Sequence, residues 1–348
     1  MINLSSDYLE GCHPSILKKL SETNLEQTPG YGLDPYCEQA ADAIRKVFAC
    51  PDSDVHFLVG GTQSNAVVIS SILRPYEGVL CASSGHINVH ETGAVEATGH
   101  KVLPLASRDG TISSAQVNVA VALQGEDEHV VRPGMVYISL ATELGTVYSL
   151  VELKDLYYTC RQNGLYLYVD GARLGYALAS PITDLRIEDI AKYSDVFTVG
   201  GTKQGALFGE AVVISNPDLK KNFRYMMKRS GALLAKGRLL GIQFLELMRN
   251  NLYFTLAKKA VDAAMRIRDA LLERKIPLLV DSPTNQLFPI LTDEQLESLE
   301  ENFELTTWER VDELHTAVRI CTSWCTPDAS VDAVIAAIRK LQPAAVSS

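Results

Sequence analysis

The stretch LYLYVDGARLGYAL, residues 165–178, decides the fold class. Its first five residues, 165–169, are apolar or aromatic, which is the composition of a strand buried inside a sheet. Asp170 follows directly, and Arg173 comes three residues later. A buried carboxylate is costly unless a cation or a hydrogen-bond donor meets it. We therefore expect Asp170 to end a buried strand and to have a functional partner there.

On both sides of this stretch, short apolar strands alternate with amphipathic helices. Strands are predicted at 135–140 and 195–201, and a helix at 150–163, where Gly164 is typical of a C-terminal cap. This alternation indicates an α/β protein with a parallel or mixed sheet and helices on both faces. Ligands of such sheets bind at the carboxyl ends of the strands, which is where Asp170 is expected.

The character of the sequence changes near residue 250. A long helical stretch, roughly 232–275, leads into further short strands and a closing helix, which indicates a smaller α/β domain. We predict three parts: an N-terminal segment that packs on the small domain or on a partner subunit (1–45), a large domain (46–248) and a small C-terminal domain (249–348).

Composition and charge indicate which kinds of partner and which cell compartment are expected for this protein. The 348 residues carry a net charge of −10, which argues against nucleic acid and anionic membranes as partners. Apolar runs stay well short of the roughly 20 residues of a membrane span, and a signal-peptide pattern is not seen at the N-terminus. The seven cysteines form no CxxC pair, so we expect reduced thiols in a cytoplasmic protein.

A glycine turn between a strand and a helix could hold a phosphate. In VGGTQSNAVVISSIL, 59–73, Gly60 and Gly61 allow close approach to the backbone, Thr62 adds a hydroxyl, and the following helix begins with free N–H groups. The pattern is neither a Walker loop nor a dinucleotide fingerprint. A plain strand-to-helix turn is the alternative interpretation.

A third strand end carries Lys203, within DVFTVGGTKQGALFGEAVVI, 195–214. A single loop lysine is commonly just solvated, but this one would lie beside Asp170 and the glycine turn. Pyridoxal phosphate needs all three groups: an amine for a Schiff base, a carboxylate beside its pyridine nitrogen and a cradle for its phosphate. We predict this cofactor, covalently bound to Lys203.

Several segments carry a resemblance to a known family. YVDGARLGYAL (168–178) resembles the aspartate-glycine-alanine-arginine-leucine element of the threonine aldolase and β-eliminating lyase family, pyridoxal phosphate enzymes of the aspartate-aminotransferase fold. The similarity extends over nearly the whole chain and is closest to the low-specificity threonine aldolases. Its other segments are SSDYLEGCHPSIL (5–17), YGLDPYCEQAADAI (31–44), GGTQSN (60–65), SSGHINVHETGA (83–94), SGALLAKGRLLGIQFLELM (230–248) and VRICTSWCT (318–326). The resemblance implies a large domain with a mostly parallel, seven-stranded type of sheet and a smaller C-terminal α/β domain.

The resemblance also implies roles for individual residues in cofactor binding. Lys203 would form the Schiff base, Asp170 would pair with the pyridine nitrogen, and His86 would stack on the ring. The phosphate and the remainder of the cofactor would be held by Gly61, Thr62 and Arg173, together with Lys236, which lies close to where many members carry an arginine that reaches a neighbouring subunit's phosphate. At that place this chain has Leu234, and a lysine lacks the bidentate fork of an arginine.

Substrate residues follow from the same resemblance. Arg319 would bind the substrate carboxylate, assisted by Ser6 and Arg173. His86, His129 or a water held by either would accept the proton of a substrate hydroxyl. The pair His86 and His90 with Glu91 could suggest a metal, but a third ligand at a typical spacing is missing, so we predict none.

The implied activity is that of an aldehyde-lyase. It would cleave L-threonine and L-allo-threonine, as β-hydroxy-α-amino acids, to glycine and an aldehyde by a retro-aldol reaction. A β-eliminating lyase or an aminotransferase on the same fold is an alternative, as is a catalytically silent homologue that binds the cofactor or an amino acid. The resemblance further implies a homodimer or homotetramer with shared active sites.

Overall fold

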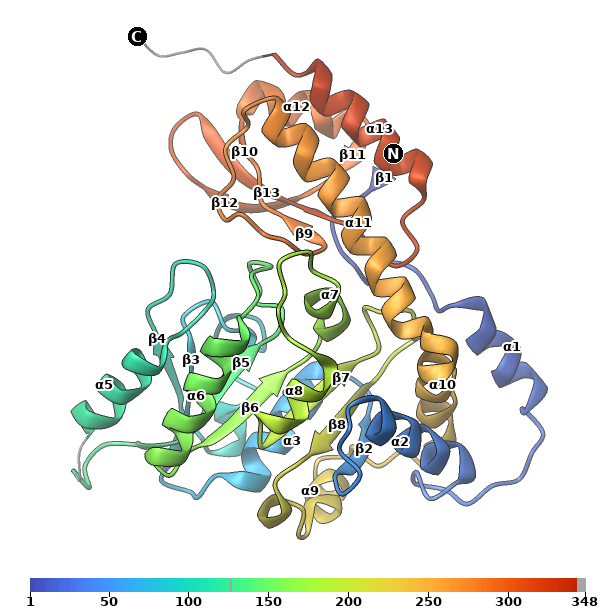
Figure 1. Cartoon of the computed structure of the whole chain (residues 1–348), viewed down its shortest axis with the longest axis vertical. Coiled ribbons are helices and arrows are strands. Elements are labelled where there is room, and N and C mark those ends of the chain that lie inside the picture. The colour runs from blue at the N-terminus through green and yellow to red at the C-terminus, as the bar shows by residue number, and fades with distance from the viewer. Residues whose placement is uncertain (125–126, 343–348) are drawn as a thin grey trace.

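The computed structural model describes residues 1–124 and 127–342 and is built around a seven-stranded sheet (Figure 1). The strands lie in the order β2 (Asp54–Leu58), β8 (Glu210–Ile214), β7 (Val196–Gly200), β6 (Tyr166–Asp170), β5 (Arg132–Ser139), β3 (Glu77–Ala82) and β4 (Val102–Leu105). β8 is antiparallel to both of its neighbours, and the other pairs are parallel. The sheet is therefore mostly parallel, as predicted.

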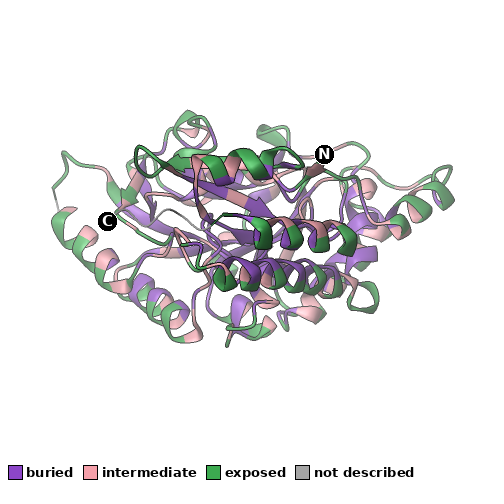
Figure 2. Ribbon diagram, turned by 90° about the horizontal axis from the view of Figure 1, so that it is seen from above, coloured by how far each residue is buried: buried purple, intermediate pink, exposed green. Residues whose placement is uncertain are grey.

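The central strands are continuous apolar runs because helices cover both of their faces. Every residue of β7 and β8 is buried, which is typical of a sheet closed on two sides. Figure 2 shows this layering, with buried strands between helices whose outer faces are exposed. Successive residues alternate between the two faces, so Val169 lies in one core and Tyr168 in the other.

Different helices cover the two faces. One core contains residues of α2 (Pro35–Val47), α6 (Leu150–Gln162), α8 (Ile187–Lys192) and α10 (Arg238–Met248). The opposite core contains residues of α3 (Gly61–Ile72) and α9 (Phe223–Arg229). Three further helices also lie in the large domain: α4 (His86–Val89), α5 (Ser114–Gln124) and α7 (Leu174–Leu178). Two 3-10 turns accompany them, η1 (Glu96–Thr98) and η2 (Pro217–Leu219).

The predicted long helix of 232–275 is two helices. α10 ends at Met248, the turn η3 (Arg249–Asn251) follows, and α11 (Leu252–Glu273) begins in a new direction. Asn250 and Asn251 have left-handed backbone conformations with φ of 52° and 61°. Asparagine tolerates this region better than most residues, and the break lets α11 carry the chain into the small domain.

The small domain packs α11 and two further helices against short strands. Its sheet contains β10 (Ile290–Thr292), β13 (His315–Cys321), β12 (Thr306–Arg310) and β9 (Gln286–Leu287), and its helices are α12 (Asp293–Glu300) and α13 (Asp328–Lys340). Apolar residues of α11, α13 and β13 form its own core. Among the described residues, no helix combines the length and apolarity that crossing a bilayer requires.

The N-terminal segment connects the two domains. β1 (Ile2–Asn3) pairs in parallel with β11 (Phe303–Glu304) of the small domain. The chain then descends along the large domain, where α1 (Pro14–Glu22) and α2 contact α10 (Figure 1). The domain boundaries at 46 and 249 stay a prediction.

Candidate active site

The predicted site residues converge because their elements end at one edge of the sheet. Asp170 ends β6, His86 follows β3, Lys203 follows β7, and Gly61 begins α3 just after β2. These strands run in the same direction, so their carboxyl ends lie together.

Asp170 is a buried carboxylate with three donors, and it is only 5% exposed. Its Oδ2 accepts hydrogen bonds from the Tyr137 hydroxyl at 2.6 Å and from Asn65 Nδ2 at 3.2 Å, and its Oδ1 accepts one from the Ala172 N–H at 2.9 Å. Tyr168 in turn donates to Asn65 Oδ1 at 2.7 Å. This network fixes the orientation of the Asp170 carboxylate.

His86 is oriented by a second buried carboxylate. Its Nδ1 lies 2.8 Å from Oε1 of Glu91, and the same oxygen accepts a hydrogen bond from Asn65 Nδ2 at 2.7 Å. Asn65 therefore joins the partner of His86 to Asp170. An Nδ1–H that donates to a carboxylate leaves Nε2 of the neutral ring as a proton acceptor.

Lys203 lies in a closed loop and is half-buried. The loop is tied together by Gly201 N–H to Gly209 O at 2.9 Å and by Gly209 N–H to the Thr202 hydroxyl at 3.0 Å. Burial and the neighbouring Arg173 lower the pKa of Lys203, against the opposing charges of Asp7, Asp170 and Glu210. A lysine with a lowered pKa is a better nucleophile toward an aldehyde.

Arg173 is paired inside this chain. Its Nε and Nη2 donate to the two oxygens of Asp7 at 2.7 and 3.0 Å, and both side chains are buried. Asn285 of the small domain donates to the same carboxylate at 2.9 Å. Burial alone would raise the pKa of Asp7, but Arg173, Lys203 and Asn285 together hold it below its usual value. The cofactor and substrate roles of Arg173 stay predictions that rest on its third nitrogen, Nη1.

Arg319 and Ser6 have buried polar atoms that await a partner. Arg319, on β13, donates from Nη2 to the Ser5 carbonyl at 2.7 Å and lies 5.9 Å from the ring centre of Trp308. Its Nε and the Ser6 hydroxyl are buried without a hydrogen-bond partner within the described residues. Buried polar atoms are normally satisfied, so the predicted binding of a substrate carboxylate by these two residues stays a prediction that would give both atoms a partner.

The turn before α3 fits a phosphate. Gly60 is the N-cap residue and offers no side-chain hydrogen bond to the first N–H groups of the helix. A Cβ atom placed on Gly60 or Gly61 would meet nothing within 4 Å, so the space beside both residues is open. Free N–H groups facing open space at a helix start favour an anion. With Lys203 and Asp170 beside it, this turn suits pyridoxal phosphate.

The placement of His129 was predicted wrongly for this chain. His129 is exposed and precedes β5, so it lies at the opposite edge of the sheet from Asp170. The eight residues of β5 separate the two edges by about 25 Å. His129 is therefore not a base in this chain's site.

Lys236 is also outside the cluster, for a different reason. It is exposed between α9 and α10 and lines a surface cavity with Thr28 and Pro29 of the N-terminal segment. Within one chain it does not lie among the residues that surround Asp170.

Three groups of the site were not given their roles there by sequence reasoning. Asn65 and Glu91 stand inside the quoted segments 60–65 and 83–94, so their position was a signal that could have found them. Tyr137 is an aromatic residue in an apolar strand, and such a residue is normally read as core.

The comparisons with known proteins agree with this geometry. A model of the β-eliminating lyase family matches residues 3–294. The chain belongs to the β-eliminating lyase family.

Relatives of this family member support the same assignment. It is 31% identical over 345 residues to a low-specificity L-threonine aldolase of a Pseudomonas species, covering 98% of both chains. The solved structure of a threonine aldolase of Leishmania major superimposes with a TM-score of 0.96 at 43% identity, covering 98% of this chain and 99% of the other. An aspartate aminotransferase of Thermus thermophilus shares the fold, with a TM-score of 0.72 at 12% identity over 98% and 91%. The predicted family and the aspartate-aminotransferase-like α/β fold are confirmed.

Proposed function

We propose that the protein is a pyridoxal phosphate-dependent aldehyde-lyase that cleaves L-threonine and L-allo-threonine to glycine and acetaldehyde. The observation that carries this proposal is the shared edge of the large sheet, where Lys203, Asp170 and His86 lie, together with Arg319 on β13 of the small domain. The similarity to threonine aldolases over the whole chain supports the same reaction.

The cofactor would be held by three groups. Lys203 would bind it covalently, Asp170 would keep the pyridine nitrogen protonated, and the turn at Gly61 and Thr62 would bind the phosphate. Bound pyridoxal phosphate supplies an electron sink for bonds at the substrate Cα. Borohydride reduction followed by peptide mapping should find the pyridoxyl group on Lys203, and its recovery on another lysine contradicts the assignment.

The substrate would be positioned by its carboxylate. Arg319 has an unpaired Nε and Ser6 an unpaired hydroxyl among the described residues. Binding of the substrate carboxylate by these two groups would hold the bond between Cα and the carboxylate carbon out of the orientation that allows decarboxylation. That grip leaves Cα–H and Cα–Cβ as the bonds that can be broken, and a β-hydroxyl favours the second.

His86 would then move the proton. With Nδ1 held by Glu91 at 2.8 Å, its Nε2 accepts the proton of the substrate β-hydroxyl. The aldehyde C=O would form from that oxygen as the Cα–Cβ bond breaks, and a proton would then be delivered to Cα to complete glycine. Because one carboxylate grip and one base fix Cα better than Cβ, we expect loose discrimination between L-threonine and L-allo-threonine.

Product identification tests the reaction. The purified holoprotein is incubated with each amino acid, and products are identified by NMR. Glycine with acetaldehyde supports the proposal. 2-Oxobutanoate with ammonia from threonine would instead identify a β-eliminating lyase, transfer of the amino group an aminotransferase, and unchanged substrate a binding protein. Each of these three results removes the aldolase proposal.

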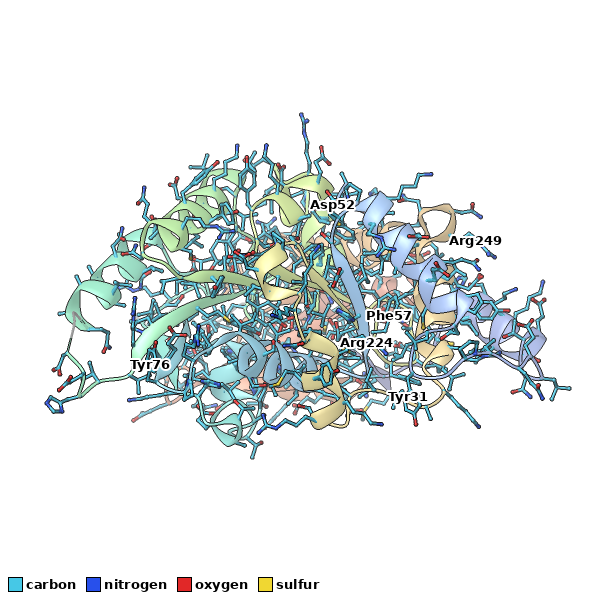
Figure 3. The ribbon with its side chains drawn as sticks, turned by 90° about the horizontal axis from the view of Figure 1, so that it is seen from below. Tyr31, Asp52, Phe57, Tyr76, Arg224 and Arg249 are labelled. Atoms are coloured by element: carbon cyan, nitrogen blue, oxygen red, sulfur yellow. The ribbon has the colours of Figure 1, made fainter. Side chains whose placement is uncertain are left out.

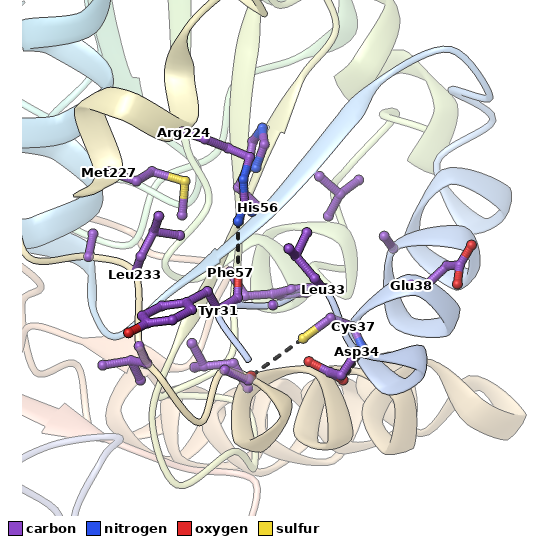
Figure 4. A pocket seen from close by; sticks show the side chains of 17 residues that line it. Tyr31, Leu33, Asp34, Cys37, Glu38, His56, Phe57, Arg224, Met227 and Leu233 are labelled. Atoms are coloured by element: carbon purple, nitrogen blue, oxygen red, sulfur yellow. Dashed lines mark hydrogen bonds between the residues drawn. The ribbon is translucent and has the colours of Figure 1, made fainter. Parts of the chain in front are cut away.

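We further infer a homodimer or homotetramer with shared sites, in the cytoplasm. A cavity of about 370 Å³ lies between the N-terminal segment and α9 (Figure 4). Arg224 donates to the carbonyl of Tyr31 there at 3.0 Å, and Tyr31 and Leu33 are exposed at its rim. Figure 3 shows Tyr31, Phe57 and Arg224 on the same part of the molecule. Exposed apolar side chains on these segments, with the outlying Lys236, support a partner subunit at this face.

A further inference from the structure

Glu210 is a buried carboxyl group to which the proposed reaction gives no task. It begins β8, which runs antiparallel to its neighbours, so the first residue of this strand lies at the same edge as the ends of the parallel strands. It pairs with Leu58 on one side and with Gly200 on the other. Leu58 stands two residues before Gly60, and Gly200 three residues before Lys203.

The side chain of Glu210 faces α3. Val212 and Ile214, two and four residues along the strand, pack in the core that contains the apolar residues of α3. Because strand residues alternate between faces, Glu210 points to that same face. Leu58, directly opposite, also lies in that core. The carboxyl group therefore stands under the first turn of α3, beside the open space at Gly60 and Gly61.

One oxygen of the carboxyl group is closed off from water and unpaired. Glu210 is 4% exposed, and its Oε2 is buried without a hydrogen-bond partner among residues 1–124 and 127–342. A charged carboxylate in such a place is unfavourable. Burial and the charge of Asp170 raise the pKa of Glu210 well above its usual value, although Lys203 opposes them. The phenol groups of Tyr168 and Tyr253 are the other titratable groups near it.

We propose that Glu210 is held as a neutral acid and that its O–H group donates a hydrogen bond to the phosphate of bound pyridoxal phosphate. This inference rests on the cofactor assignment and is independent of the reaction that follows. A neutral carboxylic acid has one O–H donor, whereas an ionised one would repel the phosphate. The phosphate itself adds negative charge nearby and keeps the proton on Glu210.

The donor has a reason to be present in this chain. Within the subunit, the turn supplies backbone N–H groups of Gly61 and Thr62 and one hydroxyl. At the place of an arginine expected from the neighbouring subunit this chain has Leu234. An additional donor beneath the turn would compensate for part of that loss.

The test compares two ligands that differ only in the phosphate. Equilibrium binding of pyridoxal phosphate and of pyridoxal is measured on Lys203→Ala protein, in which the covalent link is absent. Glu210→Gln, Glu210→Met and Glu210→Leu are added to this parent. The side-chain amide introduced by E210Q keeps a donor, so E210Q should bind both ligands like the parent. E210M and E210L fill the space without a donor and should bind pyridoxal phosphate about tenfold more weakly, with pyridoxal unaffected.

A matched control is Glu246→Met. Glu246 is also buried, but it lies on α10 and pairs with Arg249, so its loss should change the affinity for neither ligand. Circular dichroism checks that each variant folds, and two donor-free variants guard against failure of one.

Several results overturn the inference. If the donor-free variants bind pyridoxal phosphate like the parent, Glu210 donates no hydrogen bond to the phosphate. If their affinity falls equally for both ligands, the substitution has damaged the site in general and the inference fails. E210Q that weakens as much as E210M means that a carboxylate charge, and not a donor, is needed. A parent that binds neither ligand removes the cofactor assignment with it. Binding as expected without aldehyde formation from threonine leaves this inference standing and removes only the proposed reaction.

Discussion

Asp7 and Arg173 form a two-pronged ion pair that is closed off from solvent, with Nε–Oδ2 and Nη2–Oδ1 distances of 2.7 and 3.0 Å. The pair joins the N-terminal segment to the turn after β6, and Asn285 extends it to the small domain. The first ten residues are therefore part of the site's framework.

Removal of Asp7 should destabilise the protein strongly. Asp7→Ala leaves the Arg173 guanidinium buried without its counter-ion, which costs about 3–5 kcal/mol. The double variant Asp7→Ala with Arg173→Met removes both charges and should recover a large part of that loss. Urea unfolding of the wild type, both single variants and the double variant measures the coupling. A loss below about 1 kcal/mol in Asp7→Ala would show that the pair is not buried as described.

Substitution of Asp170 should spare the fold and abolish turnover. Asp170→Asn keeps the shape and its contacts with Tyr137 and Asn65, but it cannot hold a proton on a pyridine nitrogen. We expect the rate of glycine formation to fall by at least about a thousandfold. Asp269→Asn, on the exposed side of α11, is the control. Near-normal turnover in Asp170→Asn would contradict the role of this carboxylate.

Glu91 should act through His86. In Glu91→Gln the charge that keeps the proton on Nδ1 of His86 is lost, so the ring no longer presents a defined acceptor at Nε2. We expect kcat/KM for L-threonine to fall about 10–100-fold, less than for His86→Asn. Exposed Glu96→Gln should be unchanged. The base assignment fails if Glu91→Gln and His86→Asn both keep the wild-type rate and pH profile.

Shared sites should allow two inactive chains to rescue each other. Lys203→Ala lacks the cofactor lysine, and Lys236→Ala lacks the cation expected to reach the neighbour's phosphate. When the two are co-expressed, each hybrid dimer has one intact site and one site with both defects. Activity should exceed that of either parent, with light scattering confirming the oligomer. A monomer with full activity would refute the shared site.

Acid should weaken the protein partly through His56. Its Nε2 is buried without a partner in the described part of the chain, and burial lowers the pKa of His56 from 6.5 to about 4. Because the unfolded chain gains a proton that the folded chain rejects, stability is full above pH 6.5 and falls as the pH drops toward 4. The loss approaches about 3 kcal/mol.

The measurement is the urea midpoint between pH 7 and pH 4.5. His56→Leu should lose less stability over this range than the wild type, and exposed His129→Gln should follow the wild type. Parallel curves for His56→Leu and the wild type would show that another group dominates.

The strands and helices of the large domain could mostly be predicted from the sequence, because the periodicity of apolar residues indicates which face of each element is buried. The predicted strand at 165–169 corresponds to β6, which spans Tyr166–Asp170, and Gly164 follows α6 with φ of 68°. The break at Asn250 and Asn251 escaped prediction because the apolar pattern continues through it. Two asparagines in left-handed conformations do not change the spacing of the apolar residues from which the helix was predicted.

Site residues were predicted where a motif lies at the end of a strand. They were missed where the contact joins segments far apart in the sequence. Asp170 and Lys203 were found by position, whereas the binding of Arg173 to Asp7 joins residues 166 positions apart. His129 was misplaced because its role came from the resemblance alone; its position before the predicted strand 135–140 already indicates the amino end of β5, away from Asp170. Tyr137 gave no sign of its hydrogen bond, since a phenol in an apolar strand looks like packing.

The pairing of β1 with β11 orders events during synthesis. Ile2 and Asn3 leave the ribosome some 300 residues before their partners Phe303 and Glu304. At about 5–20 residues per second, the first strand waits roughly 15–60 s before its neighbour exists. Through that interval Ile2 and Asn3 have no strand to pair with. They are accessible to chaperones, modifying enzymes and proteases, whereas in the folded protein they are paired.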